Sequence, residues 1–341
     1  MNFFPVLLSF TFICASSKSP YDIRGHLASM TPYEFRGDFS PIPYSPPSGC
    51  SLASLDIVAR HGSRFPTKST RGRIEKLVDL LSEHSSELLI PWMKKWKPNL
   101  LEINDGLLCQ RGIDEHIGFG SRTTKSFSSA VLPYNPTEVV FTSTQSPRAS
   151  QSAQSFAHSV VTSSSPSRFV PVPCLSESTS SDTTLRFFDN CPRYQKEVVQ
   201  NPEALRERNI WMKAIAPGVS SRISNKTGIP VAAILADGVV DSIWETCQTE
   251  FVVDNQLGFW CSVLDMNDAL DLEFADDLDC YYTRGPGIPI SWQVSTPLLK
   301  EIVSHLDSVS LEKDTTSKPF VRSRIRFAHA ETILPFSALL G

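Results

Sequence analysis

The sequence predicts an α/β protein, and two observations support this fold class. The chain has 341 residues, of which 41% are hydrophobic and 20% charged, so it can bury a large core. Two short apolar runs, 52–58 and 138–143, each lead into a segment whose apolar residues recur at helical spacing. The sequence thus shows a strand followed by a helix in two places. This pattern indicates one α/β domain with an insertion rather than two independent folds.

The expected elements follow one another from residue 40. A Pro/Ser-rich arm, 40–49, leads into a strand that ends at Arg60, and helical spacing follows over 73–89. The strand 138–143 leads into a helix whose first turn holds Arg148. The family resemblance described below implies a further helix after 108–112. The buried faces of these three helices are expected to hold Ile74, Leu77, Leu80, Leu81 and Leu88; Ile113, Ile117 and Phe127; and Ala149, Ala153, Phe156, Ala157 and Val160.

One histidine stands between arginines where the first strand ends. Arg60, His61 and Arg64 follow the apolar run, and ligands of open α/β sheets bind beyond the carboxyl ends of strands. Guanidinium groups match the oxygens of a phosphoryl group with charge-assisted hydrogen bonds. A neutral imidazole can attack phosphorus if one ring nitrogen carries the proton and the other faces the phosphorus atom. Arg148 adds a further cation at a helix N-terminus, which itself favours an anion.

Charge and spacing argue against several other classes of protein. The net charge of −4 and the lack of a long basic run argue against a nucleic-acid binder. No C-x-x-C pair indicates a zinc site, and the acidic run 265–279 lacks the spacing of an EF-hand loop, which favours a solvated helix face over calcium binding. We therefore expect neither a metal nor a cofactor.

The N-terminus resembles a secretory signal. Residues 3–15 are apolar and small residues follow, so we expect a signal peptide over 1–17, although no Lys or Arg precedes the apolar stretch. The stretch is too short to span a bilayer. This predicts the secretory pathway, with the chain secreted or held in the endoplasmic reticulum lumen, and Asn225 in Asn225-Lys226-Thr227 is a candidate glycosylation site there.

The cysteines fit an oxidising compartment. Removing Cys14 with the signal leaves an odd number, so at least one thiol lacks a partner within the chain. Cys174 with Cys191, and Cys247 with Cys261 or Cys280, are candidate local pairs, and the connectivity stays open.

Two motifs resemble those of a known family. The string from Arg60 to Pro66 resembles the Arg-His-Gly-x-Arg-x-Pro signature of the histidine phosphatases, in the branch of acid phosphatases and phytases. His329-Ala330-Glu331-Thr332 looks like the His-Ala-Glu-Thr motif of the multiple inositol polyphosphate phosphatases. The segments 139–148, 185–191 and 260–268 support the resemblance, which runs from about Cys50 to Gly341.

The resemblance implies a domain organisation and a set of site residues. It implies an α/β phosphatase part over 18–173, an inserted α-helical domain over 174–289 and a return segment over 290–341. His61 would be the nucleophile and Glu331 the proton donor. The phosphate-binding residues would be Arg60, Arg64, Arg148 and His329.

The implied reaction is removal of phosphates from inositol polyphosphates such as phytate through a phosphohistidine. Thr67 and Lys68 are candidates for binding the substrate, and Arg71, Arg73 and Lys76 could reach its outer phosphates. A general acid phosphatase or a bisphosphoglycerate phosphatase is an alternative that keeps the same chemistry.

Two features depart from the family pattern. The chain ends at Gly341, soon after Glu331, so we expect the C-terminal part of the sheet domain to be missing. A truncated isoform that folds poorly, or that binds polyphosphates without turnover, is therefore a further alternative. The stretch 321–327 alternates basic and apolar residues, which predicts an edge strand or a strand that faces an anionic site.

Overall fold

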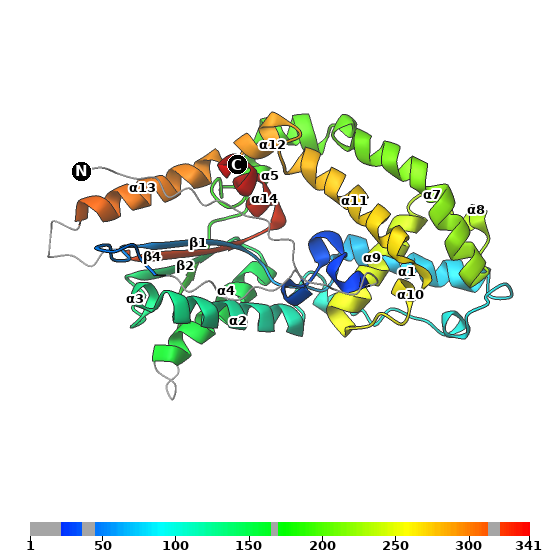
Figure 1. Ribbon diagram of the computed structural model, residues 1–341, viewed down its shortest axis with the longest axis horizontal. Coiled ribbons are helices and arrows are strands. Elements are labelled where there is room, and N and C mark those ends of the chain that lie inside the picture. Colours follow the sequence, from blue (N-terminus) through cyan, green and yellow to red (C-terminus); the bar gives the residue numbers. More distant parts are fainter. Residues whose placement is uncertain (1–21, 36–44, 165–169, 313–320) are drawn as a thin grey trace.

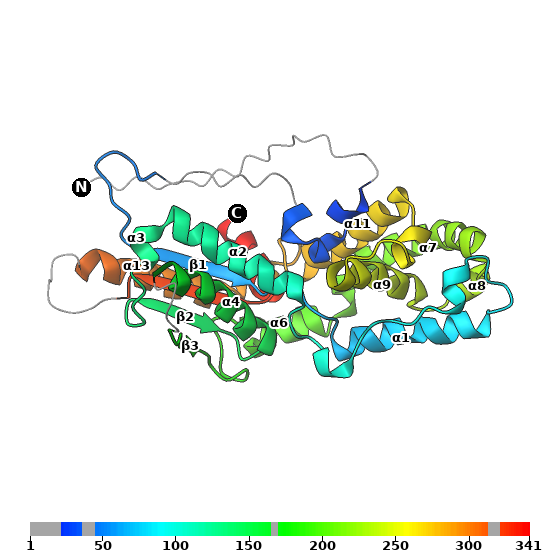
Figure 2. The same ribbon diagram turned by 90° about the horizontal axis from the view of Figure 1, so that it is seen from below.

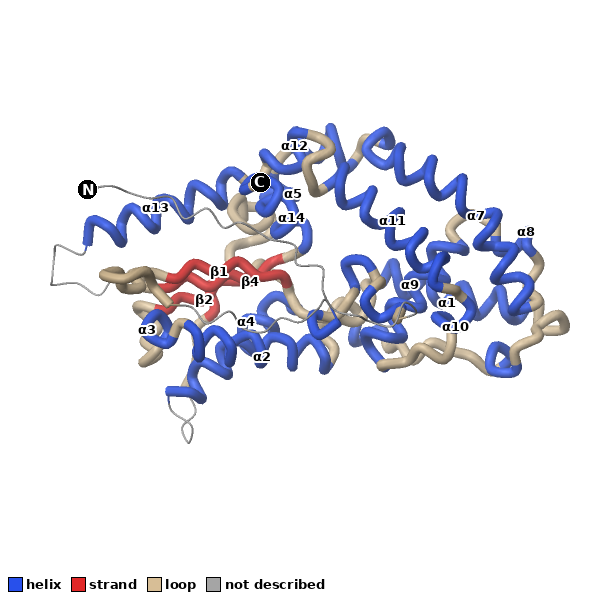
Figure 3. The backbone as a smooth tube through the Cα atoms, viewed as in Figure 1, coloured by secondary structure: helices blue, strands red, loops and turns tan. Residues whose placement is uncertain are grey.

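A four-stranded parallel sheet organises one end of the molecule (Figure 1; strands red in Figure 3). This computed structural model describes residues 22–35, 45–164, 170–312 and 321–341. The strands are β1 (Leu55–Arg60), β2 (Val139–Ser143), β3 (Cys174–Leu175) and β4 (Ser323–Ala328), in the order β1-β4-β2-β3. The last strand in sequence thus lies between the first two, and the carboxyl ends of all three meet at one edge of the sheet.

The expectation that 321–327 forms an edge strand is wrong, because β4 pairs on both sides. Its most buried basic residue faces carboxylates of the protein itself. Arg326, 2% exposed, donates to Asp56 Oδ1 of β1 at 2.8 Å and to Glu301 Oε1 of α13 at 2.9 Å. His305 of α13 also binds Asp56, with 2.7 Å between Nδ1 and Oδ2. Carboxylates inside the fold therefore neutralise the basic side of this strand.

Helices cover both faces of the sheet (Figures 1 and 2). One face carries α2 (Gln110–Ser126), α3 (Ser128–Val131) and α4 (Pro147–Ser164), and the other α12 (Pro289–Gln293), α13 (Thr296–Glu312) and α14 (Ala330–Leu340). Phe119, Phe141 and Phe327 pack edge-on around Phe156 of α4, with ring centroids 5.1–6.1 Å apart. The two predicted strand-to-helix units are confirmed, with helices that begin at Lys68 and Pro147. The expected range 73–89 is wrong for the first helix, which ends at Glu83, so the buried Leu88 lies beyond it.

The other end of the molecule is helical (Figure 1). Its long helices are α1 (Lys68–Glu83), α7 (Arg206–Thr227), α9 (Val239–Asp254) and α11 (Met266–Thr283). Their common apolar cluster includes Leu27, Ile74 and Met93 from outside 174–289. The division of the chain at 174 and 289 stays a prediction, and the helical core extends beyond that interval.

The remaining elements are short. They are α5 (Phe187–Asn190), α6 (Pro192–Tyr194), α8 (Val231–Ile234), α10 (Trp260–Val263), a π-helix at Gln195–Val199 and 3-10 turns at Ile23–Gly25, Ala28–Met30, Tyr33–Phe35, Pro91–Lys94, Glu102–Asn104 and Pro202–Leu205. In the described ranges, none of the helices combines the length and the apolar character that crossing a membrane requires.

Two sequence expectations are refined in the helical part. Cys247 forms a disulfide with Cys261, whereas Cys174, Cys191 and Cys280 are free thiols. The acidic run 265–279 is only partly solvated, because Asp268 is fully buried and accepts from Arg222 Nε at 2.7 Å.

Two further predictions are not tested by the structure. Asn225 is exposed, and its glycosylation stays a prediction. The signal peptide falls on 1–17, outside the described residues.

Replacing Arg326 with Leu should destabilise the fold by about 3–5 kcal/mol, because it leaves the buried Asp56 carboxylate without its main counter-charge. Denaturant unfolding of the variant measures this loss. Arg193→Gln, which breaks an exposed ion pair with Glu197, is the control and should leave the stability nearly unchanged. Equal effects of the two changes would contradict this account of β4.

Candidate active site

His61 directly follows β1 and its ring is fixed by the backbone. The His61 N–H donates to Ala328 O at 2.9 Å, which continues the β1–β4 pairing past Arg60. The side chain is 8% exposed, and Nδ1 lies 2.9 Å from Gly62 O. Since a carbonyl oxygen only accepts, Nδ1 carries the proton and Nε2 keeps a lone pair. This is the tautomer that attack on phosphorus requires.

The surroundings keep this ring neutral. Burial lowers the pKa of His61 well below its ordinary value of 6.5, and the charges of Arg60, Arg148 and His329 lower it further. The hydrogen bond to Gly62 opposes these effects only in part. A neutral imidazole in a positively charged site is a nucleophile whose lone pair is not lost to a proton at mildly acidic pH.

Close backbone packing explains why residue 62 is a glycine. A Cβ atom on Gly62 would lie 2.5 Å from Gly112 O, and one on Gly112 would lie 1.9 Å from Ser63 O. The loop after β1 therefore rests directly on the first turn of α2. Ser152 Oγ of α4 accepts from Gly62 N at 3.0 Å, which ties the same loop to the helix that carries Arg148.

Arg60 and Arg64 line one cavity with His61, and the charge of Arg148 also acts on its ring. Burial lowers the pKa of Arg64 to about 10, and the nearby charges of Arg148 and Arg60 add to this effect. The Nε atoms of Arg64 and Arg148 are buried and have no acceptor among the described residues. No described carboxylate forms an ion pair with either side chain. Such partly unsatisfied cations are typical of a site that binds an anion.

His329 lies beyond β4, opposite His61, with ring centroids 5.5 Å apart. Its Nδ1 lies 3.3 Å from Arg148 Nη2, and its Nε2 lies 3.2 Å from Arg186 Nη1 and 2.9 Å from Thr144 Oγ1. A neutral imidazole accepts at one nitrogen only, so at least one of these guanidinium groups lacks an acceptor in this contact. Burial, followed by the charges of Arg148 and Arg186, lowers the pKa of His329 to about 3.

Thr332 explains how the second motif positions its histidine. The buried Thr332 Oγ1 accepts from the His329 N–H at 3.4 Å and donates to Leu185 O at 2.7 Å. One hydroxyl thus joins the first turn of α14 to the segment that carries Arg186. Because α14 begins at Ala330, Glu331 lies in its first turn.

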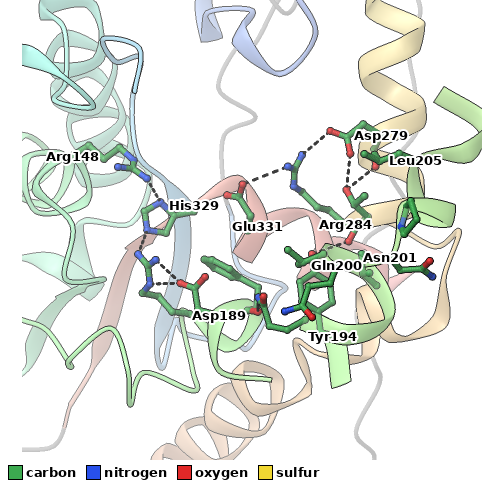
Figure 4. A pocket seen from close by; sticks show the side chains of 17 residues that line it. Arg148, Asp189, Tyr194, Gln200, Asn201, Leu205, Asp279, Arg284, His329 and Glu331 are labelled. Atoms are coloured by element: carbon green, nitrogen blue, oxygen red, sulfur yellow. Dashed lines mark hydrogen bonds and ion pairs between the residues drawn. The ribbon is translucent and has the colours of Figure 1, made fainter. Parts of the chain in front are cut away.

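Glu331 faces a cavity of about 710 Å³ between the sheet and the helical part (Figure 4). Burial alone would raise the pKa of Glu331, but Arg284 foremost, then a hydrogen bond from its own backbone N–H, and then Arg60 and His329 hold it below the ordinary value. Arg284 Nη2 lies 3.6 Å from Glu331 Oε1. The cavity is lined by Arg148, Arg186, Phe188, Asp189, Tyr194, Gln195, Val198, Val199, Gln200, Asn201, Pro202, Leu205, Asp279, Thr283, Arg284, His329 and Glu331.

The basic residues on α1 have other partners. Arg71 donates to both oxygens of Asp105 at 2.8 and 3.0 Å, and Arg73 donates to Glu245 at 2.8 Å. Thr67 caps α1 and accepts from Thr70 N at 3.4 Å, while Lys68 is 82% exposed. None of these four is among the described residues that line the 710 Å³ cavity. Arg60, His61 and Arg64 are not among them either, and line a second cavity of about 420 Å³. The roles of the first four in substrate binding stay predictions.

Sequence reasoning missed two arginines of the site, Arg186 and Arg284. Arg186 precedes α5 and donates to Asp189 at 2.7 Å, and Arg284 follows α11. Neither has a spacing that relates it to His61. These two arginines are recognised as site residues only in the folded structure, where the helical part lies next to the edge of the sheet. Within the described ranges, no group of three or more His, Cys, Asp or Glu residues is placed to hold a metal ion.

The fold and the paired histidines agree with a comparison of sequences. The chain belongs to the histidine phosphatase superfamily (branch 2), whose sequence model matches residues 51–341. The chain is 28% identical to the multiple inositol polyphosphate phosphatase 1 of Dictyostelium discoideum and 26% identical to that of Homo sapiens. These alignments cover 87% and 96% of this chain. The chain spans 54% of the Dictyostelium protein and 70% of the human one.

Solved structures share the fold. The phytase from D. castellii superposes with a TM-score of 0.67 at 16% identity, over 96% of this chain and 71% of that one. The Bifidobacterium longum multiple inositol polyphosphate phosphatase in complex with inositol hexasulfate gives 0.67 at 17% identity, over 92% and 79% of the two chains.

The tautomer of His61 can be tested by ¹⁵N NMR of histidine-labelled protein, with the signals assigned through His61→Asn. We expect the His61 ring to stay neutral, with its proton on Nδ1, between about pH 5.5 and 7.5, because burial and neighbouring cations disfavour the imidazolium form. The exposed His158 supplies a reference signal. A His61 titration centred near 6.5, or a proton on Nε2, would contradict this geometry.

Proposed function

We propose that the chain is a phosphomonoesterase that removes phosphates from inositol polyphosphates through a phosphohistidine. The observation that carries this proposal is the orientation of His61. Its Nδ1 proton is held by Gly62 O, which leaves Nε2 free within a group of arginines. Membership of the histidine phosphatase superfamily and the names of the relatives support the same reaction and substrate class.

In the first step, the Nε2 lone pair of His61 forms a bond to phosphorus as the bond from phosphorus to the inositol oxygen breaks. Glu331 gives its proton to the departing oxygen and becomes a carboxylate, so the product is a free hydroxyl. Arg60, Arg64, Arg148 and His329 bind the phosphoryl oxygens and stabilise the charge that these carry in the transition state.

In the second step, the Glu331 carboxylate takes a proton from a water molecule. The water oxygen bonds to phosphorus as the N–P bond breaks, which releases inorganic phosphate and restores neutral His61. Glu331 acts as acid and then as base, so it ends each cycle protonated. The cations that hold its pKa low in the free protein must therefore be balanced by the charge of the bound phosphate.

The size and lining of the cavity suit a polyphosphorylated ring. Arg148, Arg186 and Arg284 line a volume of about 710 Å³, within the range of small-molecule sites. A simple phosphomonoester would use only the cations around His61. Arg186 adds a cation for a substrate with phosphates beyond the one that reacts, whereas Arg284 lies against Asp279 and Glu331.

We also propose that the chain enters the secretory pathway through residues 1–17, and that Asn225 is glycosylated there. The apolar stretch 3–15, the disulfide Cys247–Cys261 and the exposure of Asn225 support this proposal.

The reaction is tested by phosphate release from inositol hexakisphosphate between about pH 4 and 7.5. His61→Ala should abolish release because no nucleophile remains, and Glu331→Gln should lower it by about 10²–10⁴-fold because proton transfer is lost. Both variants should still bind the substrate in calorimetry, since the arginines are kept. Arg193→Gln, on the exposed face of a helix, is the control.

The outcomes separate the alternatives. Binding of inositol hexakisphosphate without release by the wild type would favour a non-catalytic polyphosphate binder. Release from p-nitrophenyl phosphate or bisphosphoglycerate, but not from inositol hexakisphosphate, would favour a general acid phosphatase or a bisphosphoglycerate phosphatase. Release that persists in His61→Ala would exclude the phosphohistidine.

A further inference from the structure

Arg284 bridges the two parts of the molecule at the proton donor. It is the C-cap of α11 in the helical part, and its backbone N–H donates to Cys280 O at 2.9 Å. Its guanidinium group lies between two carboxylates, with Nη2 3.6 Å from Glu331 Oε1 and Nη1 3.8 Å from Asp279 Oδ2. Glu331 belongs to α14 beside the sheet, so this ion pair crosses the cavity.

The contact is electrostatic rather than a fixed hydrogen bond. At 3.6 Å, the nitrogen and oxygen lie beyond ordinary hydrogen-bond distance, and the two side chains are 26% and 38% exposed. The carboxyl of Glu331 is therefore not locked to Arg284 and can still reach a leaving oxygen. The charge of Arg284 nevertheless acts on it at close range.

The other charges near Glu331 come from different elements. Arg60 at the end of β1 and His329 before α14 favour its carboxylate form, and it interacts at longer range with Arg64 and Arg148. Tyr194 of α6 also responds to its charge. Arg60, Arg64 and Arg148 belong to the proposed phosphate-binding group, so the substrate would offset them.

Arg284 differs from this group in its position. Figure 4 shows His329 and Arg148 on one side of Glu331, and Arg284 with Asp279 on the other. A phosphoryl group bound at His61 would not lie between Arg284 and its two carboxylates. Among the described residues, Asp279 is the other ion-pair partner of Arg284, and it partly offsets the same positive charge.

We propose that Arg284 is a positioning residue that sets the pH range over which Glu331 carries the proton that it transfers, and that Asp279 moderates this effect. This inference rests on the proposed function. Removal of Arg284 lets Glu331 keep its proton to higher pH. Removal of the Asp279 charge strengthens the effect of Arg284 on Glu331 and has the opposite result. A purely structural role would not produce shifts of opposite sign.

The test compares pH profiles of kcat/KM for two substrates. With inositol hexakisphosphate, Arg284→Gln should move the basic limb up by about one pH unit, and Asp279→Asn should move it down. With p-nitrophenyl phosphate, whose leaving group departs without a proton, both variants should keep the wild-type limb. Arg284→Lys, which keeps the charge, should remain near the wild type. Arg24→Gln, which removes a surface arginine paired with Asp22, is the control.

A second measurement does not depend on turnover. The Glu331 carboxyl carbon, assigned through Glu331→Gln, is titrated by ¹³C NMR in the wild type and in the folded variants. Opposite shifts in Arg284→Gln and Asp279→Asn would support the inference even if no phosphate is released, in which case only the proposed function fails. Shifts of the same sign, or unchanged titrations in an active enzyme, would overturn the inference alone.

Discussion

The parallel pairing of β4 between β1 and β2 is the constraint on which the site depends. Arg60 pairs with Ala328, and Ser143 pairs with Phe327. The next residue of each strand, His61, Thr144 or His329, therefore reaches the same edge of the sheet. Backbone bonds extend this register beyond the strands, since His61 N–H donates to Ala328 O and Thr144 N–H donates to Phe327 O. Two histidines that are far apart in the sequence thus face each other because of backbone geometry.

The protein treats buried charge in two ways. Inside the sheet, Arg326 is matched by Asp56 and Glu301, so its burial requires no ligand. At the edge of the sheet, Arg64 and Arg148 have no matching carboxylate among the described residues, and burial lowers the pKa of both. A charge left unbalanced at low exposure destabilises the free protein. Unbalanced positive charge beside a neutral histidine is typical of a site that binds an anion.

Sequence reasoning reached the strand-to-helix units and the two motifs, because each is local. Residue order alone places His61 after a strand and Arg148 in the first turn of a helix. The position of β4 was missed, since its basic residues suggested an edge and their buried partners lie far away in the sequence. Arg186 and Arg284 were missed for the same reason. Their function depends on how the helical part meets the sheet, which no local pattern encodes.

The position of β4 also bears on how the chain acquires its structure. The apolar cluster of the helical part uses residues between Leu27 and Leu272, so all of its parts exist before β4 is synthesised. The sheet is different, because β1 and β2 make their main pairings with β4 and not with each other. Such distant pairings form slowly, because a long loop must close before any contact stabilises it. During synthesis, β1 and the edge of β2 that faces β4 therefore stay unpaired until β4 is made, and unpaired strand edges are prone to aggregation.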